Sequence, residues 1–395
     1  MTEVLRGIRI IEQGTFITGP CAGMMLADLG ADVIKVESPE GDPYRSYQGG
    51  HYSPHFQAYN RNKRSIALDL KKTLDRDLFD GLVREADVYI QNFRPGTAER
   101  LGAGVSRLRQ VNPGLVYCSI SGFGSSGPYV DRPSYDSVAQ ALSGFLSVVV
   151  DAERPRFLGP ALADAITGIY AAYGVLGALL ERSRTGRGNL VEVSMLEAMA
   201  HFAIEPFAAF FALGDVPKSS DRPRLAQAYI LRTADGKLIA IHLSSLEKFW
   251  TGLVTALGDA GLNADPRFSK RQARIDNYEA LGAELDRRFR ERPLAYWSRA
   301  LGENDVPFAP INGIDQVIED PQVRHLDLIV PAESPNGAGR SVRPAVQFGG
   351  KHAACVKAAP LLDQDGRAIR VAIANGERWP SAGHAAVELR ATANS

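Results

Sequence analysis

Residues 157–182 read FLGPALADAITGIYAAYGVLGALLER, an apolar run that ends in a charged pair. Gly159 and Pro160 break the chain where a helix can begin, because the N–H that proline lacks would have no partner in a first helical turn. Asp164 is the only ionisable group before Glu181, tyrosines apart. We therefore expect a buried helix with one carboxylate about one turn from its start, where the positive end of the helix dipole favours the ionised form.

Two simpler interpretations of this stretch compete with a functional one. An acid in the first turn of a helix most often stabilises only that helix end. Residues 161–180 also form a run of 20, the length that crosses a bilayer. However, the run contains Asp164, is rich in Ala and Gly, and stands in a chain without a second strong span. A central buried helix is the better prediction, and no membrane association is expected.

The overall composition suggests a two-domain protein without a dominant charge. The chain has 395 residues, 45% of them hydrophobic, which is enough to bury a large core. Its 45 basic and 45 acidic residues cancel. No global field therefore favours nucleic acid or an anionic membrane, and an anionic ligand has to be bound by local cations.

The cysteines and the N-terminus indicate the compartment. Cys21, Cys118 and Cys355 are few, odd in number and far apart, and none forms a Cys-x-x-Cys pair. This pattern predicts neither a disulfide framework nor a zinc site, and we expect no metal. The N-terminus, MTEVLRG, shows no apolar signal segment. We expect a cytoplasmic protein.

The N-terminal part alternates strand and helix. Residues 8–11 are typical of a buried strand, 20–29 of a helix and 31–37 of a second strand. This order predicts a parallel sheet of the Rossmann kind. The turn at 13–20, QGTFITGP, lacks the G-x-G-x-x-G fingerprint, and Pro20 removes an N–H that a dinucleotide pyrophosphate would need. NAD is therefore not expected.

A basic segment and a glycine-rich loop are the next candidates for ligand binding. Five cations lie within residues 61–72, where they could bind phosphates or simply form a solvated surface. A helix is predicted at 73–85, and strands at 87–92 and 115–120. The last strand leads into the loop 121–128, SGFGSSGP, at the edge where open α/β sheets bind ligands.

The second half of the chain predicts a smaller domain. Residues 226–242 are typical of a hairpin and 246–301 of short helices, while strands are expected near 339–347 and disorder in the last ten residues. We therefore predict a large domain at 1–214, a linker at 215–224, a small α+β domain at 225–310 and a C-terminal part at 311–395.

Eight strings occur in order along the chain: LRGIRIIE (5–12) with TGP (18–20), LGADVIKVE (29–37), NKRS (62–65), NFRPG (92–96), SGFG (121–124), RPSYD (132–136), DAITG (164–168) and TGRG (185–188). Each string alone is weak evidence. Together they resemble the family III CoA-transferases, which include formyl-CoA, carnitine and bile-acid CoA-transferases and share their fold with the α-methylacyl-CoA racemases.

The resemblance implies an interlocked homodimer. Each chain would form a Rossmann-like large domain, made from its N-terminal part and its returning C-terminal tail, with a smaller domain between them. The resemblance places the catalytic aspartate at Asp164, a tyrosine beside the acyl group at Tyr135, and Ile17 in the acyl pocket. Coenzyme A or acyl-CoA is then a substrate, and the residues implied to contact it or to neutralise its phosphates are Phe16, Leu68, Lys71, Asn92, Phe93, Arg94 and Arg100.

The implied reaction moves CoA from an acyl-CoA donor to a free carboxylic acid acceptor through an aspartyl-CoA thioester on Asp164. A carboxylate that is already ionised at neutral pH needs no base to attack the thioester, and neither ATP nor a metal is required. Backbone N–H groups at the helix start and in a glycine loop are expected to stabilise each oxyanion.

Two alternatives belong to other classes. A racemase-type isomerase needs two acid-base groups, and Tyr135 stands where the racemases have a histidine. His51, His55 and His201 could in principle substitute, although surface or core positions are commoner for such residues. A non-catalytic acyl-CoA-binding protein is disfavoured by Asp164, since a pure binder has no use for an ionised group in an apolar helix start.

The acyl substrate is only partly constrained. Formyl-CoA transferases carry a run of glycines over the active site, and residues 227–232 have none. They also have a glutamine at the position of Ile17 and an arginine at the position of Ser38. We therefore do not expect oxalate and formate as the pair. Ile17 favours a larger or partly apolar acid, and succinyl-CoA is a donor by analogy.

Overall fold

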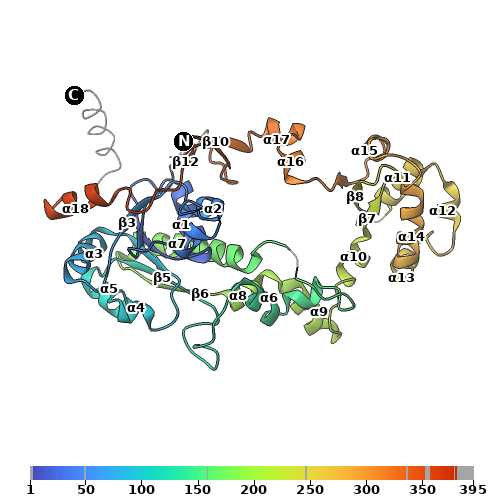
Figure 1. The fold of residues 1–395 in the computed structure, drawn as a ribbon. Helices are drawn as coiled ribbons and strands as arrows, with labels where there is room; N and C mark the ends of the chain where they lie inside the picture. The colour runs from blue at the N-terminus through green and yellow to red at the C-terminus, as the bar shows by residue number, and fades with distance from the viewer. Residues whose placement is uncertain are drawn as a thin grey trace. The chain divides into compact units, whose positions relative to one another are not determined.

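The computed structural model describes residues 3–48, 50–157, 159–244, 247–334, 337–351, 356–377 and 379 (Figure 1). The chain divides into two units, which are described separately. The larger unit comprises Met1–Leu146, Phe157–Ile204 and His325–Ser395, and the smaller unit comprises Ser147–Arg156 and Glu205–Arg324. The boundaries predicted after residues 214 and 310 both lie inside the long segment of the smaller unit, Glu205–Arg324.

A six-stranded parallel sheet forms the centre of the larger unit, in the order β3-β2-β1-β4-β5-β6. Ile10 in β1 pairs with Val33 on one side and with Val88 on the other, so the strand order reverses between β1 and β4. The predicted α/β class with a Rossmann-like sheet is confirmed. The strands are β1 (Arg9–Gln13), β2 (Asp32–Glu37), β3 (Arg64–Ala67), β4 (Val88–Gln91), β5 (Val116–Ser121) and β6 (Leu190–Ser194).

Helices cover both faces of this sheet. Successive strand residues point to opposite faces, so neighbouring residues belong to different cores. Ile10 belongs to the core beneath α1 and α7, whereas Ile11 belongs to the core beneath α3, α5 and α18. Both side chains are fully buried, which is typical of a parallel sheet covered on two sides. The covering helices are α1 (Thr18–Asp28), α3 (Thr73–Glu85), α5 (Val105–Val111), α7 (Leu162–Thr185) and α18 (Gly366–Ala374).

Helix α7 contains the apolar run. It begins at Leu162, so the prediction of Pro160 in its first turn is wrong, and Asp164 lies in that turn instead. Among the described residues, α7 is long and apolar enough to cross a membrane, and the bent pair α8 (Met195–Phe202) and α9 (Ile204–Leu213) would be a second candidate only if counted as one span. Here α7 packs against α1 and β5, as a core helix does.

A glycine sets how closely α7 approaches α1. A Cβ on Gly168 would lie 2.6 Å from Cβ of Cys21 and 2.9 Å from the backbone oxygen of Thr18. Both distances are shorter than a carbon normally tolerates. Gly168 therefore lets the start of α7 lie directly on α1, next to the loop that precedes α1.

The smaller unit contains a three-stranded antiparallel sheet, β7-β8-β9, with its own core. The predicted hairpin is present, since Ala228 pairs with His242 and Arg232 with Leu238. The predicted linker is not wholly irregular, because α10 (Asp221–Ala226) begins within it and continues past its end. The other elements are β7 (Ala228–Arg232), β8 (Leu238–His242), β9 (Phe308–Pro310), α11 (Lys248–Leu257), α12 (Ala260–Ala264), α13 (Arg271–Asp276), α14 (Tyr278–Phe289) and α15 (Leu294–Glu303).

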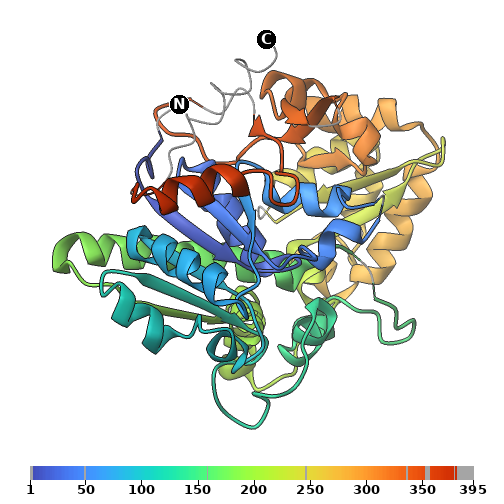
Figure 2. The same cartoon turned by 60° about the vertical axis from the view of Figure 1, so that its left-hand side comes forward.

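The C-terminal part rejoins the larger unit. Ser65 in β3 exchanges two 3.0 Å hydrogen bonds with Asp365, one through each backbone N–H, and α18 packs against α3 (Figure 2). A second sheet contains β10 (Ile329–Ser334), β11 (Gly337–Val342) and β12 (Val356–Lys357), so the strand predicted near 339–347 ends earlier. The expected disorder of the last ten residues concerns positions outside the described residues.

We predict that Gly168→Ala lowers the free energy of unfolding by about 1–3 kcal/mol, because the new methyl group overpacks the contact with α1. Gly302→Ala, at an exposed position of α15, is the control, since a Cβ there meets only a ring carbon of Phe308 at 3.8 Å, an ordinary contact. It should stabilise the protein by up to about 1 kcal/mol through helix propensity. Thermal and urea unfolding of the two variants and the wild type measure both changes in the free energy of unfolding. Equal stabilisation by the two substitutions would contradict the close contact.

Candidate active site

Two adjoining cavities lie at the carboxyl ends of the strands in the larger unit. The small cavity has a volume of about 240 Å³ and the large cavity about 460 Å³. Thr15 and Phe93 belong to the walls of both. The small cavity contains Asp164 together with Phe16, Ile17, Asn92, Arg94, Ile120, Gly122, Phe123, Val130, Arg132, Tyr135 and Met195, and the large cavity contains Leu68 and Lys71.

A carboxylate from another helix caps the first turn of α7. Oδ1 of Asp136, the first residue of α6 (Asp136–Leu142), accepts hydrogen bonds from the backbone N–H of Ala163 at 2.7 Å and of Asp164 at 3.3 Å. The N-cap residue Ala161 has no side chain that could do this. Asp136 belongs to the string RPSYD, but its role could not be predicted, because a cap from a distant element leaves no local spacing signal.

This cap changes the electrostatics of Asp164. Burial, together with the nearby charge of Asp136, raises the pKa of Asp164 to about 7. The expectation that the helix start keeps Asp164 fully ionised at neutral pH is therefore wrong. The first-turn N–H groups are also occupied, since Leu162 and Ala165 donate to backbone carbonyls. They are not free to stabilise an oxyanion, which leaves the loop at Gly122 and Phe123 as the candidate.

The loop before α1 is held in an unusual conformation. Phe16 has a φ of 58°, a left-handed backbone that costs a residue with a side chain on the order of 1–3 kcal/mol. Its N–H donates to Asp42 over 3.1 Å. The Asn92 side chain accepts from the N–H of Thr15 at 2.9 Å and donates to the Thr15 carbonyl and the Thr18 hydroxyl. Asn92 therefore positions this loop.

A buried network of charges lies beneath the same loop. Nζ of Lys35 lies 3.0 Å from Asp42 and 3.3 Å from Glu12, and Nζ of Lys63 lies 2.9 Å from Glu12. All four side chains are inaccessible to solvent or nearly so. Lys35 also donates to the carbonyl of Gly14 over 2.8 Å. Buried charges persist when they are paired in this way, and here the pairs fix the turn that carries Phe16.

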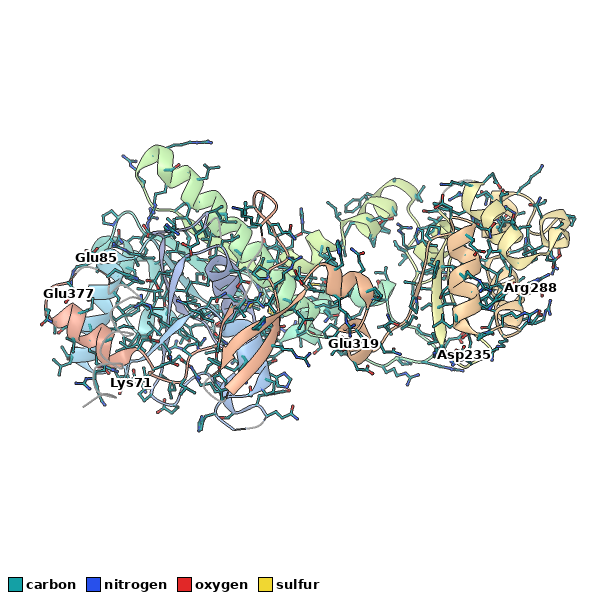
Figure 3. The ribbon with its side chains drawn as sticks, turned by 90° about the horizontal axis from the view of Figure 1, so that it is seen from above. Lys71, Glu85, Asp235, Arg288, Glu319 and Glu377 are labelled. Atoms are coloured by element: carbon teal, nitrogen blue, oxygen red, sulfur yellow. The ribbon has the colours of Figure 1, made fainter. Side chains whose placement is uncertain are left out.

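The cations of residues 61–72 do not form a phosphate-binding group. Lys63 is buried in the network, and Arg61 and Arg64 pair with Asp28 and Asp32, 2.6 and 2.7 Å away. Lys72 lies 3.9 Å from Asp69. Lys71, labelled in Figure 3, is the cation of this segment that lines the large cavity.

Most residues implied by the resemblance meet at the two cavities. Asp164, Tyr135, Ile17, Phe16, Asn92 and Arg94 line the small cavity, Leu68 and Lys71 line the large one, and Phe93 lines both. Arg100 lines neither; its guanidinium donates to Thr97 in the same short helix, α4 (Thr97–Arg100). The ring of Phe16 contacts those of Tyr135 and Tyr44, with centroids 6.1 and 5.7 Å apart.

The histidines considered as alternative bases lie elsewhere. His51 contacts Ser46, His55 contacts Gln48, and Nδ1 of His201 lies 2.6 Å from the hydroxyl of Tyr170. None of the three lines the small or the large cavity. Among the described residues there is also no group of three or more His, Cys, Asp or Glu that could hold a metal ion.

Known proteins resemble the chain over most of its length. A family model described as CoA-transferase family III matches residues 5–366. An acetyl-CoA:oxalate CoA-transferase of Acetobacter aceti is 32% identical over 92% of this chain and 94% of its own, and a succinate–glutarate CoA-transferase of Agrobacterium fabrum is 36% identical over 84% and 86%. The crystal structure of a CAIB/BAIF family protein from Brucella suis superimposes with a TM-score of 0.83 and 34% identity, covering 93% and 99%.

The pKa of Asp164 predicts a pH-dependent stability. Between about pH 4 and pH 7 the folded protein keeps a proton that the unfolded chain releases, so this group lowers the free energy of unfolding as the pH rises. Asp164→Asn should therefore gain stability relative to the wild type over this window, by at most about 1.4 kcal/mol per pH unit.

Urea unfolding at intervals from about pH 5 to pH 8 measures this difference. Asp131→Asn, an exposed position in the loop before α6, is the control and should follow the wild type at every pH. A constant difference between Asp164→Asn and the wild type would show that Asp164 does not titrate in this range.

Proposed function

The chain belongs to CoA-transferase family III, and we propose that it moves CoA from an acyl-CoA to a free carboxylic acid through an aspartyl-CoA thioester on Asp164. That it is a CoA-transferase follows from its relatives; the intermediate and the residue that carries it are our proposal. The observation that supports them most is the position of Asp164. Among the residues that the structure describes, it is the one carboxylate in the wall of the small cavity, beside a larger cavity that contains Lys71.

Each step exchanges one anion for another. A carboxylate oxygen of Asp164 attacks the thioester carbonyl of the donor, the C–S bond breaks, and CoA leaves as a thiolate from a mixed anhydride. The thiolate then attacks the aspartyl carbonyl, and the donor acid leaves as a carboxylate. The acceptor carboxylate reverses both steps and restores free Asp164. No proton, metal or ATP enters the balance, and the thioester is conserved.

The environment of Asp164 suits this reaction. With a pKa of about 7, the carboxyl is about half ionised at neutral pH and becomes the nucleophilic carboxylate as the pH rises. A carboxylate with a raised pKa is also more basic, and hence more nucleophilic, than an ordinary aspartate. The glycine-rich loop at Gly122 lines the same cavity and is the proposed source of N–H donors for the oxyanion.

The coenzyme has a matching set of side chains. We assign the adenine nucleotide to the large cavity, where Leu68 offers an apolar surface and Lys71 a cation for a phosphate. The pantetheine would pass the shared wall at Thr15 and Phe93 and bring its sulfur to Asp164. Arg94 is available at the small cavity for a phosphate, whereas Arg100 would act only if the phosphate extended beyond the cavities.

An isomerase reaction has weaker support. Removal and return of an α-proton need two acid-base groups, and the small cavity offers Asp164 together with the phenol of Tyr135. A phenol ordinarily ionises near pH 10 and is a poor base at neutrality.

We expect that Asp164→Ala abolishes transfer, with a loss of at least about 1000-fold, while the affinity for CoA changes only a few-fold. Borohydride added during turnover should reduce the enzyme thioester, and mass spectrometry of the peptide should place the modification on Asp164. Glu181→Gln, at the other end of α7, is the control and should retain transfer. Modification of another acidic residue would relocate the nucleophile, and α-proton exchange without CoA transfer would support the isomerase.

We also propose that the protein is a cytoplasmic homodimer. Within the larger unit, α7 leaves apolar side chains exposed, including Tyr173 at 73% and Leu180 at 56%. Within the smaller unit, α9 exposes Phe211 at 77% and Leu213 at 74%. Exposed apolar surface of this kind often marks a protein interface.

Light scattering of the purified protein should therefore give twice the 42.8 kDa of one chain. Leu180→Glu combined with Phe211→Glu should shift the mass toward the monomer, because charges would then lie in the interface. A wild-type mass of one chain across the concentration range would contradict the dimer.

A further inference from the structure

Arg132 is a cation of the small cavity without an acidic partner. No ion pair or side-chain hydrogen bond found among the described residues includes its guanidinium, although the guanidinium lies in the same cavity wall as Asp164. Two aromatic rings position it instead. Its Cζ lies 4.4 Å from the ring centroid of Tyr129 and 5.8 Å from that of Phe123. A guanidinium stacked in this way keeps its N–H edge available for a ligand.

The loop that carries Arg132 makes contacts within itself and with the glycine-rich loop. The backbone N–H of Arg132 donates to the Tyr129 carbonyl over 3.0 Å, and the rings of Tyr129 and Phe123 contact each other with centroids 5.9 Å apart. Phe123 belongs to the glycine-rich loop that follows β5. Arg132 is exposed to solvent, and these contacts place its guanidinium at the cavity wall.

The charge of the small cavity changes during the proposed reaction. Its ionisable side chains, Tyr135 apart, are Asp164, Arg94 and Arg132. Once Asp164 is bound to CoA as a thioester it carries no charge, and two guanidinium groups remain. Arg94 is assigned above to the coenzyme. Arg94 also lines a neighbouring cavity of about 510 Å³, which Arg132 does not line. Neither guanidinium lines the large cavity, so Arg132 is the one that belongs to the small cavity alone, on the acyl side.

We propose that Arg132 binds a second carboxylate of the acid substrate, and that this enzyme therefore acts on small dicarboxylic acids. The inference rests on the proposed function, because it assigns the acyl end of the reaction to the small cavity. One carboxylate would react at Asp164 while the other accepts two N–H groups from Arg132, the geometry in which arginine binds carboxylates best.

The size and walls of the cavity agree with this substrate class. A volume of about 240 Å³ is below the roughly 300–1,000 Å³ of sites for drug-sized ligands. Ile17, Ile120 and Met195 give the cavity an apolar side that can contact the methylene groups between two carboxylates. In this proposal Ile17 contacts the apolar chain of the acid substrate, and Arg132 binds the charged group at its far end.

The test separates the acceptor from the donor by using a half-reaction. The full-length enzyme is loaded with succinyl-CoA or acetyl-CoA, the aspartyl-CoA form is isolated and verified by mass, and acyl-CoA formation is then followed after an acid is added. Each dicarboxylate is compared with the monocarboxylate of equal chain length: succinate with butyrate, glutarate with pentanoate, and adipate with hexanoate.

At least one dicarboxylate should discharge the loaded wild-type enzyme about 10- to 100-fold faster than its monocarboxylate, at acid concentrations below saturation. This factor corresponds to a hydrogen-bonded charge pair. Arg132→Met should remove most of that preference and leave the monocarboxylate rates within a few-fold. Arg132→Lys keeps the positive charge but loses the paired N–H donors of the guanidinium. Its preference for the dicarboxylate should lie between those of the wild type and Arg132→Met. Arg187→Met, an exposed arginine in the turn after α7, is the control and should match the wild type.

Failure of this inference differs from failure of the proposed function. If the wild type loads and both acids of every pair discharge it equally, or if Arg132→Met slows both equally, the second-carboxylate role is wrong while the transferase mechanism stands. If Arg132→Met changes only the concentration of acyl-CoA needed for loading, Arg132 serves the coenzyme and the proposal is overturned. If no aspartyl-CoA form accumulates with any donor and no acid yields acyl-CoA, the proposed function itself fails.

Discussion

The contact between Asp136 and the first turn of α7 is the constraint on which the site depends. One oxygen of Asp136 accepts from the N–H groups of Ala163 and Asp164, so the helix end is satisfied by an anion from outside the helix. The same anion lies close enough to oppose the ionisation of Asp164. Geometry and ionisation are therefore linked, because burial raises the pKa of Asp164 and the carboxylate that caps its helix turn raises it further.

The part of the small-cavity wall that contains Phe16 is held by buried ion pairs. The left-handed residue Phe16 is held by Asp42, which in turn belongs to a buried set of paired charges with Lys35 and Glu12. These side chains come from strand ends and from the loop after β2, so the sheet itself supports the strained turn. Removing Lys35 would take from Asp42 the cation that lies 3.0 Å away, and a buried charge that loses its partner is strongly destabilising. The network therefore holds the backbone of the turn that carries Phe16.

Local sequence patterns predicted the helices and strands well, but they did not predict which charged side chains pair with one another. Helix α3 has the bounds that its sequence predicts, and the apolar run does form a core helix whose first turn contains Asp164. The cations at Arg61 and Arg64 were open to misinterpretation because their partners, Asp28 and Asp32, are distant in sequence and are brought near by the order of the parallel strands. The role of Asp136 as a cap was not predicted for the same reason, because it contacts residues that are distant in sequence. The raised pKa of Asp164, to which Asp136 contributes, was therefore not predicted either.

The return of the C-terminal segment has a consequence for how the protein is made. The face of the sheet beneath α3 is completed by α18, and the backbone of Ser65 finds its partner only at Asp365. A chain emerging from the ribosome must therefore synthesise the whole smaller unit before the larger one can close. Until then an apolar surface stays open, so the nascent protein is exposed to aggregation for longer than a protein whose domains are continuous in sequence.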